Sequence, residues 1–484
     1  MRPVGDSMEN NMFRVLLACL LMVGTAAKAD NIERDLDAIV QSYGKVGIFA
    51  GTVLVAHDGK TVYEAAVGLA NRETNVPNRA NTRFNIGSIG KTFTAVSILQ
   101  LAEAGKLKLS DPISRFLPDI PYAEKDTITV AHLLNHSAGT GNYMAHKDFA
   151  ANMGKLRTID AFLPLIYDQP PSFAAGSRFQ YSNSGMVLLG AVVEKASGQS
   201  YRNYLRDHIF KPAGMTDSSL TLEDEPLPNR SIGYTRNGDG SISSNVRSVP
   251  PPSSDGGMRT TTRDMLRYDQ ALKRTALLSE ASKAAMWTPV GPDKEYAFGW
   301  ERKSAFGDTV IGHNGGAPGI NAVFRRYQGS GYTVIVLSNT GMGASDVAEK
   351  IEARLYGKPV QLAVQADSDM MLALDLVMRG DLRGAAKLYD RNPSHAPSVY
   401  QAARTRIDGG YEATEAIALL DRYLRFDAAV QVAPPAGAWW RKGVAYEQLG
   451  DKAKARASYM QSLALDPAFD KAKQALAKLD TPKT

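Results

Sequence analysis

The sequence contains almost no cysteine, carries little net charge and has no long hydrophobic run. Its only cysteine among 484 residues is Cys19. If the N-terminal segment that contains Cys19 is removed, the remaining chain has neither a disulfide nor a thiol and must be stabilised by core packing. The net charge is +6 and the basic residues are scattered, which argues against a nucleic-acid partner. The apolar run at residues 15–23 is shorter than the about 20 residues that a membrane-spanning helix needs, so we expect no transmembrane segment.

Residues 1–29 have the features of a cleaved secretory signal peptide. Arg14 precedes the apolar run, and Ala27 and Ala29 are small residues of the kind found at signal-peptide cleavage sites. We therefore predict cleavage after Ala29 and an exported product, either periplasmic or secreted.

Strand patterns occur at both ends of the region 30–357, with mostly helical and loop sequence between them. The predicted strands are 51–56, 61–67, 308–312, 322–327 and 332–339. Asp58-Gly59 marks the turn of the first hairpin, and helical spacing at 344–356 ends at Gly357. These patterns predict a mixed α/β (α+β) fold, in which one antiparallel sheet is flanked by helices and accompanied by an all-helical part.

Beyond residue 357 the strand signals stop and a repeat signal begins. Several residues occur at the offsets of a single helix-turn-helix repeat of the tetratricopeptide type, about 34 residues long. They are Trp439, Gly443, Tyr446, Gly450, Ala455, Tyr459 and Pro467. One such unit cannot bury its own apolar face, so we predict a C-terminal α-helical repeat domain over residues 358–484.

Two Ser-x-x-Lys tetrads occur, Ser42 to Lys45 and Ser88 to Lys91, and roughly two are expected by chance in a chain of this composition. Only the second is followed by a helical apolar stripe, which places Ser88 at the start of a buried helix. Residues three apart share one helix face, so Lys91 would lie beside the Ser88 hydroxyl. A serine hydroxyl needs a neighbouring base to become a nucleophile, and burial at a helix N-terminus favours the neutral amine that could serve.

Two further motifs follow in the chain. Tyr181-Ser182-Asn183 comes after a loop rich in proline and glycine and precedes an apolar helix. His313-Asn314-Gly315 ends the predicted strand 308–312 and leads into Gly316. Each motif alone is weak, but the order of the three, each in its own structural setting, is specific.

Together they resemble the Ser-x-x-Lys, Tyr-x-Asn and Lys/His-x-Gly motifs of class C β-lactamases, DD-carboxypeptidases, D-aminopeptidases and related esterases. The segments 84–88, 133–139 and 256–261 are also similar to that group, and the resemblance covers about residues 33–357. It implies a β-lactamase/transpeptidase-like domain over residues 30–357.

The resemblance also implies roles for individual residues. Ser88 would form an acyl-enzyme, with Lys91 as general base, alone or together with Tyr181; the sequence does not apportion the task. Asn183, His313, Gly315 and Gly316 would bind the substrate. The backbone N–H groups of Ser88 and Gly316 would form the oxyanion hole. No cofactor and no metal are implied.

The third motif departs from the β-lactamase form, because His313 stands where β-lactamases keep lysine. Asn314 and Gly316 also lack a hydroxyl. A lysine ammonium and a hydroxyl are the groups that would hold a substrate carboxylate at this position. Arg325 or Arg326 could replace the lost charge. The sequence therefore favours a small peptide, amide or ester substrate, with a true class C-type β-lactamase as the alternative.

Other interpretations stay open at this stage. The chain could be an inactive hydrolase fold that serves as a binding protein, with a protein partner on its repeats. His132 and His136 have the helical spacing of zinc ligands but lack the glutamate of that motif, so we expect no metal site. The segment 253–257 is either a loop near the site or a simple turn.

Overall fold

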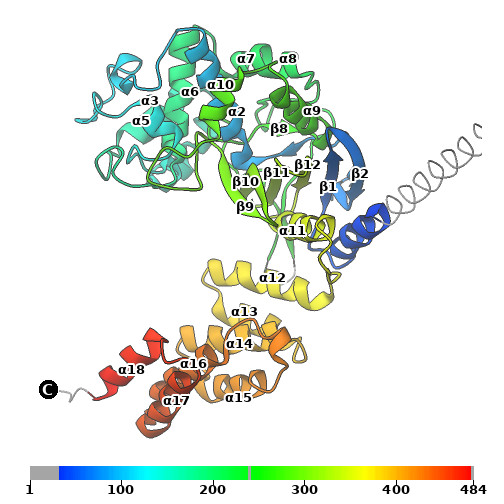
Figure 1. Cartoon of the computed structure of the whole chain (residues 1–484), viewed down its shortest axis with the longest axis vertical. Coiled ribbons are helices and arrows are strands. Elements are labelled where there is room, and N and C mark those ends of the chain that lie inside the picture. Colours follow the sequence, from blue (N-terminus) through cyan, green and yellow to red (C-terminus); the bar gives the residue numbers. More distant parts are fainter. Residues whose placement is uncertain (1–31, 238–240, 481–484) are drawn as a thin grey trace, which may run out of the picture. The chain divides into compact units, whose positions relative to one another are not determined.

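The computed structural model describes residues 32–237 and 241–480, and the predicted signal peptide lies outside these ranges. The described chain divides into two compact units (Figure 1). Unit 1 comprises residues 32–235 and 244–362, and unit 2 comprises 236–237, 241–243 and 363–480. Every residue predicted to act in catalysis or substrate binding lies in unit 1.

Unit 1 is built on a six-stranded sheet of order β2-β1-β12-β11-β10-β9, in which all neighbours are antiparallel. The strands are β1 (Gly51–His57), β2 (Lys60–Val67), β9 (Glu301–Ala305), β10 (Asp308–Ala317), β11 (Ile320–Tyr327) and β12 (Tyr332–Ser338). Gly51 pairs with Ser338, so strands from the two ends of the domain meet in the sheet centre. The fold class predicted from the sequence is confirmed.

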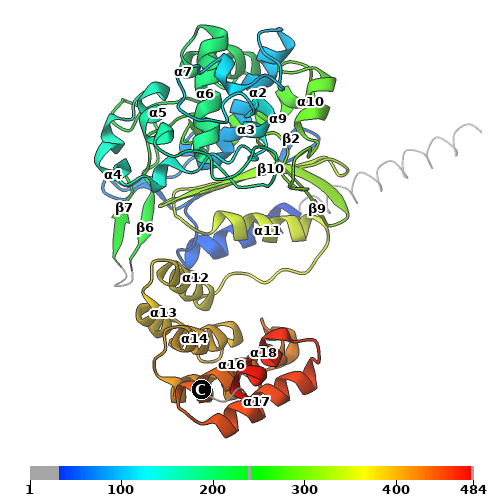
Figure 2. The ribbon, with the colours of Figure 1, turned by 90° about the vertical axis from the view of Figure 1, so that its left-hand side faces the viewer.

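Helices cover both faces of this sheet. Helix α11 (Ala344–Leu355) packs on one face, while α9 (Thr262–Lys273) and α2 (Gly90–Glu103) lie on the other, as Figure 2 shows. The central strands are buried on both sides, and Val53, Leu54 and Val55 are wholly inaccessible to solvent. Such strands are expected to be continuously apolar, which is why β1 shows no polar alternation.

One helix covers residues 32–45, before β1. The remaining helices of unit 1 lie between α2 and β9 in the chain, and most of them pack on α2 or on α6. They are α3 (Val130–Leu134), α4 (Phe149–Asn152), α5 (Ile159–Tyr167), α6 (Asn183–Ser197), α7 (Tyr201–Leu205), α8 (Lys211–Ala213) and α10 (Glu280–Met286). Three short two-stranded ladders accompany them: β3 (Leu69–Asn71) with β4 (Val76–Pro77), β5 (Phe84–Asn85) with β8 (Arg259–Thr260), and β6 (Tyr234–Arg236) with β7 (Ile242–Ser244). Helix α2 is buried over most of its circumference, so it is a core helix without a polar face.

Strand β10 is longer than the sequence predicted. The pattern placed its end at residue 312, but the ladder with β11 continues through His313, which pairs with Phe324, to Ala317, which pairs with Ile320. Inter-strand hydrogen bonding therefore overrides the weak strand propensity of His-Asn-Gly-Gly. As a result, the third motif lies inside a strand.

Unit 2 is entirely helical apart from the few residues of the β6–β7 connection. Its helices are α12 (Gln365–Met378), α13 (Leu382–Asp390), α14 (Ala396–Asp408), α15 (Ala413–Tyr423), α16 (Pro435–Gln448), α17 (Lys452–Leu465) and α18 (Asp470–Asp480). Gly443 of α16 faces the buried ring of Tyr459 on α17, where an added Cβ would stand 2.2 Å from Cε1. The repeat spacing thus reflects close helix packing. Within the described ranges, no helix is long and apolar enough to span a bilayer.

Candidate active site

Ser88 lies in a single 3₁₀ turn, η1 (Gly87–Ile89), that leads directly into α2. Lys91 is in the first turn of that helix and its side chain is completely buried, whereas Ser88 stays partly exposed. The apolar stripe of α2 draws Lys91 into the core, and the preceding turn leaves the serine hydroxyl accessible.

The amine of Lys91 contacts three oxygens at once. Its Nζ atom lies 3.0 Å from Oγ of Ser88, 2.8 Å from Oδ1 of Asn183 and 2.6 Å from the carbonyl oxygen of Asp255. The amide and carbonyl oxygens can only accept hydrogen bonds. They therefore accept from two N–H groups of the amine, and the remaining position of the nitrogen faces Ser88.

The Tyr-x-Asn motif stands at the N-terminus of α6. Ser182 caps the helix by accepting a hydrogen bond from the N–H of Gly185, which turns Asn183 toward Lys91. Tyr181 is 40% exposed, and its ring centroid lies 4.9 Å from Nζ of Lys91. Within the described residues its hydroxyl makes no hydrogen bond, so this group is available to a bound molecule.

The glycines of β10 pass directly beside the Ser88 turn. A Cβ on Gly315 would stand 1.9 Å from the carbonyl oxygen of Ile86, so no side chain fits there. The nitrogen of Gly316 lies 2.9 Å from the place of a Cβ on Gly87, which itself has a positive φ of 51°. The two expected oxyanion donors thus come from neighbouring backbone segments.

His313 is buried and both of its ring nitrogens are occupied. Nε2 lies 3.1 Å from the phenol oxygen of Tyr296, and Nδ1 lies 2.6 Å from the carbonyl oxygen of Asn314. Burial lowers the pKa of His313 to about 4, so the ring is uncharged at neutral pH. His313 is therefore not a cation that could replace the lysine of β-lactamases.

Neither arginine of β11 is available to fill that place. Arg326 is buried and its Nε lies 2.6 Å from Oδ1 of Asp269, while Nη1 of Arg325 lies 2.6 Å from Oε2 of Glu352. Strand β10 itself contains no lysine or arginine. This wall of the site thus carries no uncommitted positive charge from β10 or β11.

The sequence did not assign a role to three residues that surround the site. His136 and Tyr296 are buried and joined by a hydrogen bond of 3.0 Å, and Tyr143 donates to Oδ2 of Asp255 at 3.1 Å. The similarity of segment 133–139 to the family could have drawn attention to His136. The other two have no motif, because their roles arise only from long-range packing.

The segment 253–257 is a loop at the site, since the carbonyl of Asp255 accepts from Lys91. The other Ser-x-x-Lys tetrad is part of a helix in which Ser42 donates to the carbonyl of Ile39. His132 completes the capping box of α3 by accepting from the backbone N–H of the N-cap Thr129, and it does not share a helix face with His136, because α3 ends at Leu134. The described residues contain no cluster of three or more metal-ligating side chains.

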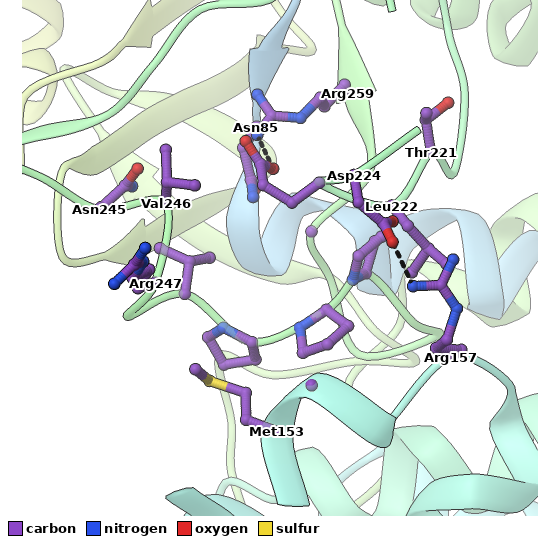
Figure 3. Close-up of a pocket in the computed structure, with 17 residues that line it drawn as sticks. Asn85, Met153, Arg157, Thr221, Leu222, Asp224, Asn245, Val246, Arg247 and Arg259 are labelled. Atoms are coloured by element: carbon purple, nitrogen blue, oxygen red, sulfur yellow. Dashed lines mark hydrogen bonds and ion pairs between the residues drawn. The ribbon is translucent and has the colours of Figure 1, made fainter. Parts of the chain in front are cut away.

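A cavity of about 350 Å³ adjoins this site without Ser88 or Lys91 in its wall (Figure 3). Its lining includes Gly257 from the loop that holds Lys91, the adjacent Pro252, and the ion pair of Arg157 with Asp224, whose closest atoms are 2.7 Å apart. Asn85, also in the wall, accepts a hydrogen bond from the backbone N–H of Gly87. The cavity and the Ser88 turn thus share supporting backbone.

Comparison with known proteins identifies the family. Residues 31–357 match the family model described as beta-lactamase, and residues 436–469 match a tetratricopeptide repeat model. The chain belongs to the β-lactamase family, whose members are serine hydrolases, and it carries a C-terminal tetratricopeptide repeat. The resemblance inferred from the three motifs is confirmed.

Relatives in this family include penicillin-binding proteins and an amidohydrolase. A penicillin-binding protein of Bacillus subtilis is 30% identical and covers 74% of this chain and 84% of its own length. The crystal structure of a penicillin-binding protein from Bacillus halodurans is 34% identical, with a TM-score of 0.61 over 67% of this chain and 98% of that one. A D-stereospecific amidohydrolase from Streptomyces sp. is 25% identical, with a TM-score of 0.57 over 67% and 99%.

Proposed function

We propose that this protein hydrolyses an amide, peptide or ester bond through an acyl-enzyme on Ser88. The observation that carries this proposal is the set of three contacts around Lys91, at 3.0, 2.8 and 2.6 Å from Ser88, Asn183 and Asp255. The oxygens of Asn183 and Asp255 can only accept hydrogen bonds from the buried amine. The Ser88 hydroxyl is therefore the one contact of Lys91 that can exchange a proton with it.

In the first step, the neutral amine of Lys91 accepts the proton of Ser88 while Oγ forms a bond to the substrate carbonyl carbon. The carbonyl electron pair moves to oxygen, where the N–H groups of Ser88 and Gly316 would stabilise it. The bond to the leaving group then breaks, and the leaving nitrogen or oxygen takes the proton from Lys91, directly or through Tyr181. Water then hydrolyses the ester in the same way.

The charge distribution supports a substrate without a carboxylate next to the scissile bond. His313 is uncharged, and Arg325 and Arg326 are engaged with acidic residues. A carboxylate bound at this wall would lose hydration without gaining a charged partner. We therefore favour amides and esters without a carboxylate over β-lactams, and the similarity to a D-stereospecific amidohydrolase makes D-amino-acid amides the first substrates to test.

The test is active-site labelling combined with a substrate panel. A fluorophosphonate probe should modify Ser88 in the wild type and should not modify Ser88→Ala. Turnover of p-nitrophenyl esters and D-amino-acid amides should exceed that of nitrocefin. Equal labelling of the two proteins, or ester turnover no faster than that of Lys91→Ala, would favour a binding protein with an inactive site.

The repeats and the signal peptide suggest where this activity is used. The tetratricopeptide repeat supports a protein partner, or a polymeric substrate brought to the hydrolase by unit 2. Export of the chain remains our proposal from residues 1–29. Fractionation of cells that produce the full chain, with N-terminal sequencing of the product, would test cleavage after Ala29.

A further inference from the structure

Two histidines and one tyrosine form a buried chain of hydrogen bonds that ends on β10. The phenol oxygen of Tyr296 lies 3.0 Å from Nε2 of His136 and 3.1 Å from Nε2 of His313. All three side chains are buried. The reaction proposed above gives Tyr296 no part, although this residue connects two histidines that flank the site.

The hydrogen bonds at the two ends of this His136–Tyr296–His313 network determine where each proton lies. The backbone N–H of Ser182 donates to Nδ1 of His136, so a neutral His136 carries its proton on Nε2 and donates it to Tyr296. At the other end, Nδ1 of His313 faces the carbonyl oxygen of Asn314 at 2.6 Å. A carbonyl can only accept, so His313 carries its proton on Nδ1 and receives the phenol proton of Tyr296 on Nε2.

The charges around His313 are consistent with a neutral ring. Burial has the largest effect and lowers its pKa, and Glu301 on β9 opposes this. Lys303 adds to the lowering, as does Lys91 whenever its amine is protonated. The rings of Tyr181 and Tyr296 also lie near His313, with centroids 6.3 and 5.8 Å from its own, and His136 is close enough to interact with it electrostatically. The one proton of the neutral imidazole can therefore be assigned by hydrogen bonding alone.

The other two members of the chain also stay uncharged at neutral pH. Burial holds the pKa of His136 well below its usual value, and it raises the pKa of the Tyr296 phenol well above the usual range. The phenol therefore keeps the single proton that it donates, and each of the two imidazole rings carries one proton.

We propose that Tyr296 is a positioning residue: its hydrogen bond holds His313 in the Nδ1–H tautomer and thereby fixes the Asn314 carbonyl and the Gly315–Gly316 backbone beside Ser88. Without the phenol, only the Asn314 carbonyl would favour the Nδ1–H tautomer, and a fraction of the molecules would carry the proton on Nε2. Nδ1 would then turn a lone pair toward the carbonyl of Asn314, and the repulsion would displace the strand that supplies the proposed oxyanion donor. For its effect on turnover this inference rests on the proposed function, whereas the tautomer does not.

The tautomer can be measured without any substrate. In protein labelled with ¹⁵N in its seven histidines, long-range ¹H–¹⁵N spectra at pH 7 distinguish protonated from unprotonated ring nitrogens, and His313→Gln assigns the His313 signals by their loss. We expect a protonated Nδ1 and an unprotonated Nε2 in the wild type. A proton on Nε2, or on both nitrogens, would overturn the proposal even if the enzyme is active.

Kinetics of Tyr296→Phe then test the consequence. We expect kcat to fall roughly 3- to 10-fold, the factor that corresponds to one neutral hydrogen bond, with little change in KM. The acid limb of the kcat profile should move to higher pH, because Nε2 of His313 loses the donor that satisfied its lone pair. An unchanged His313 spectrum together with an unchanged profile would refute the proposal.

Tyr122→Phe provides the matched control. Tyr122 is also buried, and its phenol donates to the carbonyl of Ile166 at 2.7 Å. The Tyr122→Phe variant should lose about as much free energy of unfolding as Tyr296→Phe, but it should keep the wild-type His313 spectrum and the wild-type pH profile of kcat. If no protein turns over any ester or amide while the wild-type spectrum is as expected, the proposed function fails and the tautomer assignment stands.

Discussion

The amine nitrogen of Lys91 lies 2.6 Å from the carbonyl oxygen of Asp255, a residue 164 positions further along the chain. This contact ties the loop of residues 253–257 to the first turn of the helix that follows the nucleophile. Tyr143 supports the loop from the other side by donating to the Asp255 carboxylate at 3.1 Å. The position of the proposed general base thus depends on three segments that are distant in sequence.

Lys91→Met keeps the volume of the side chain but removes the proton acceptor. We expect kcat/KM for esters to fall by about 10²–10⁴, the usual contribution of a positioned general base, and labelling of Ser88 to become undetectable. Stopped-flow hydrolysis of a p-nitrophenyl ester measures the first effect, and mass spectrometry of the fluorophosphonate adduct measures the second.

Lys283→Met is the control for that experiment. Lys283 is equally buried, and it donates to the carbonyl of Leu272 at 3.0 Å and to Glu280 at 2.6 Å, with no contact to Ser88. Its replacement should destabilise the fold by a comparable amount and leave Ser88 reactive. Loss of labelling in both variants would show that the effect of Lys91→Met comes from unfolding.

Gly315→Ala tests the close approach of β10 to the nucleophile turn. The new Cβ would stand 1.9 Å from the carbonyl oxygen of Ile86, so the strand must move away from Ser88. We expect a loss of about 1–3 kcal/mol in the free energy of unfolding and a loss of about 10²–10³ in kcat if an oxyanion donor is displaced. Gly154→Ala, whose Cβ meets no atom within 4 Å, should change neither value appreciably.

Much of this architecture could be predicted from local sequence patterns. The continuous apolar run of β1 and the three-residue spacing of Ser88 and Lys91 are local features, and both are present in the structure as expected. The carbonyl of Asp255 could not be predicted as a partner of Lys91, because a backbone atom carries no signature of its own. Tyr296 was equally hidden, since its neighbours suggest only a core aromatic residue.

The acid side of the stability profile should depend on His313. An unfolded histidine has a pKa near 6.5, whereas burial lowers the folded value to about 4. Between these values the unfolded chain binds a proton that the folded protein does not, so the free energy of unfolding must fall as the pH decreases from 6.5 to 4. The contribution is about 3 kcal/mol, and no further loss from this group occurs below pH 4.

Urea denaturation at a series of pH values measures this effect. His313→Gln should flatten the decline between pH 6.5 and 4, and the remaining slope should include His136, whose pKa is also lowered by burial. Replacement of His57, an exposed residue with 46% side-chain accessibility, should leave the slope as in the wild type. A variant at position 313 with an unchanged slope would contradict the assignment of a neutral buried ring.

Gly443→Ala separates the integrity of the repeats from the chemistry of unit 1. The added methyl would stand 2.2 Å from the buried ring of Tyr459, so α16 and α17 must move apart, at a cost of about 1–3 kcal/mol in the stability of unit 2. Gly437→Ala on the same helix meets only Phe469, at 3.9 Å, and should be neutral or stabilising by about 0.5–1 kcal/mol.

Calorimetry and ester hydrolysis check both variants: because all the proposed catalytic residues lie in unit 1, kcat/KM should stay within about twofold of the wild type. A parallel loss of activity and repeat stability in Gly443→Ala would mean that the hydrolase requires its repeats even for small substrates.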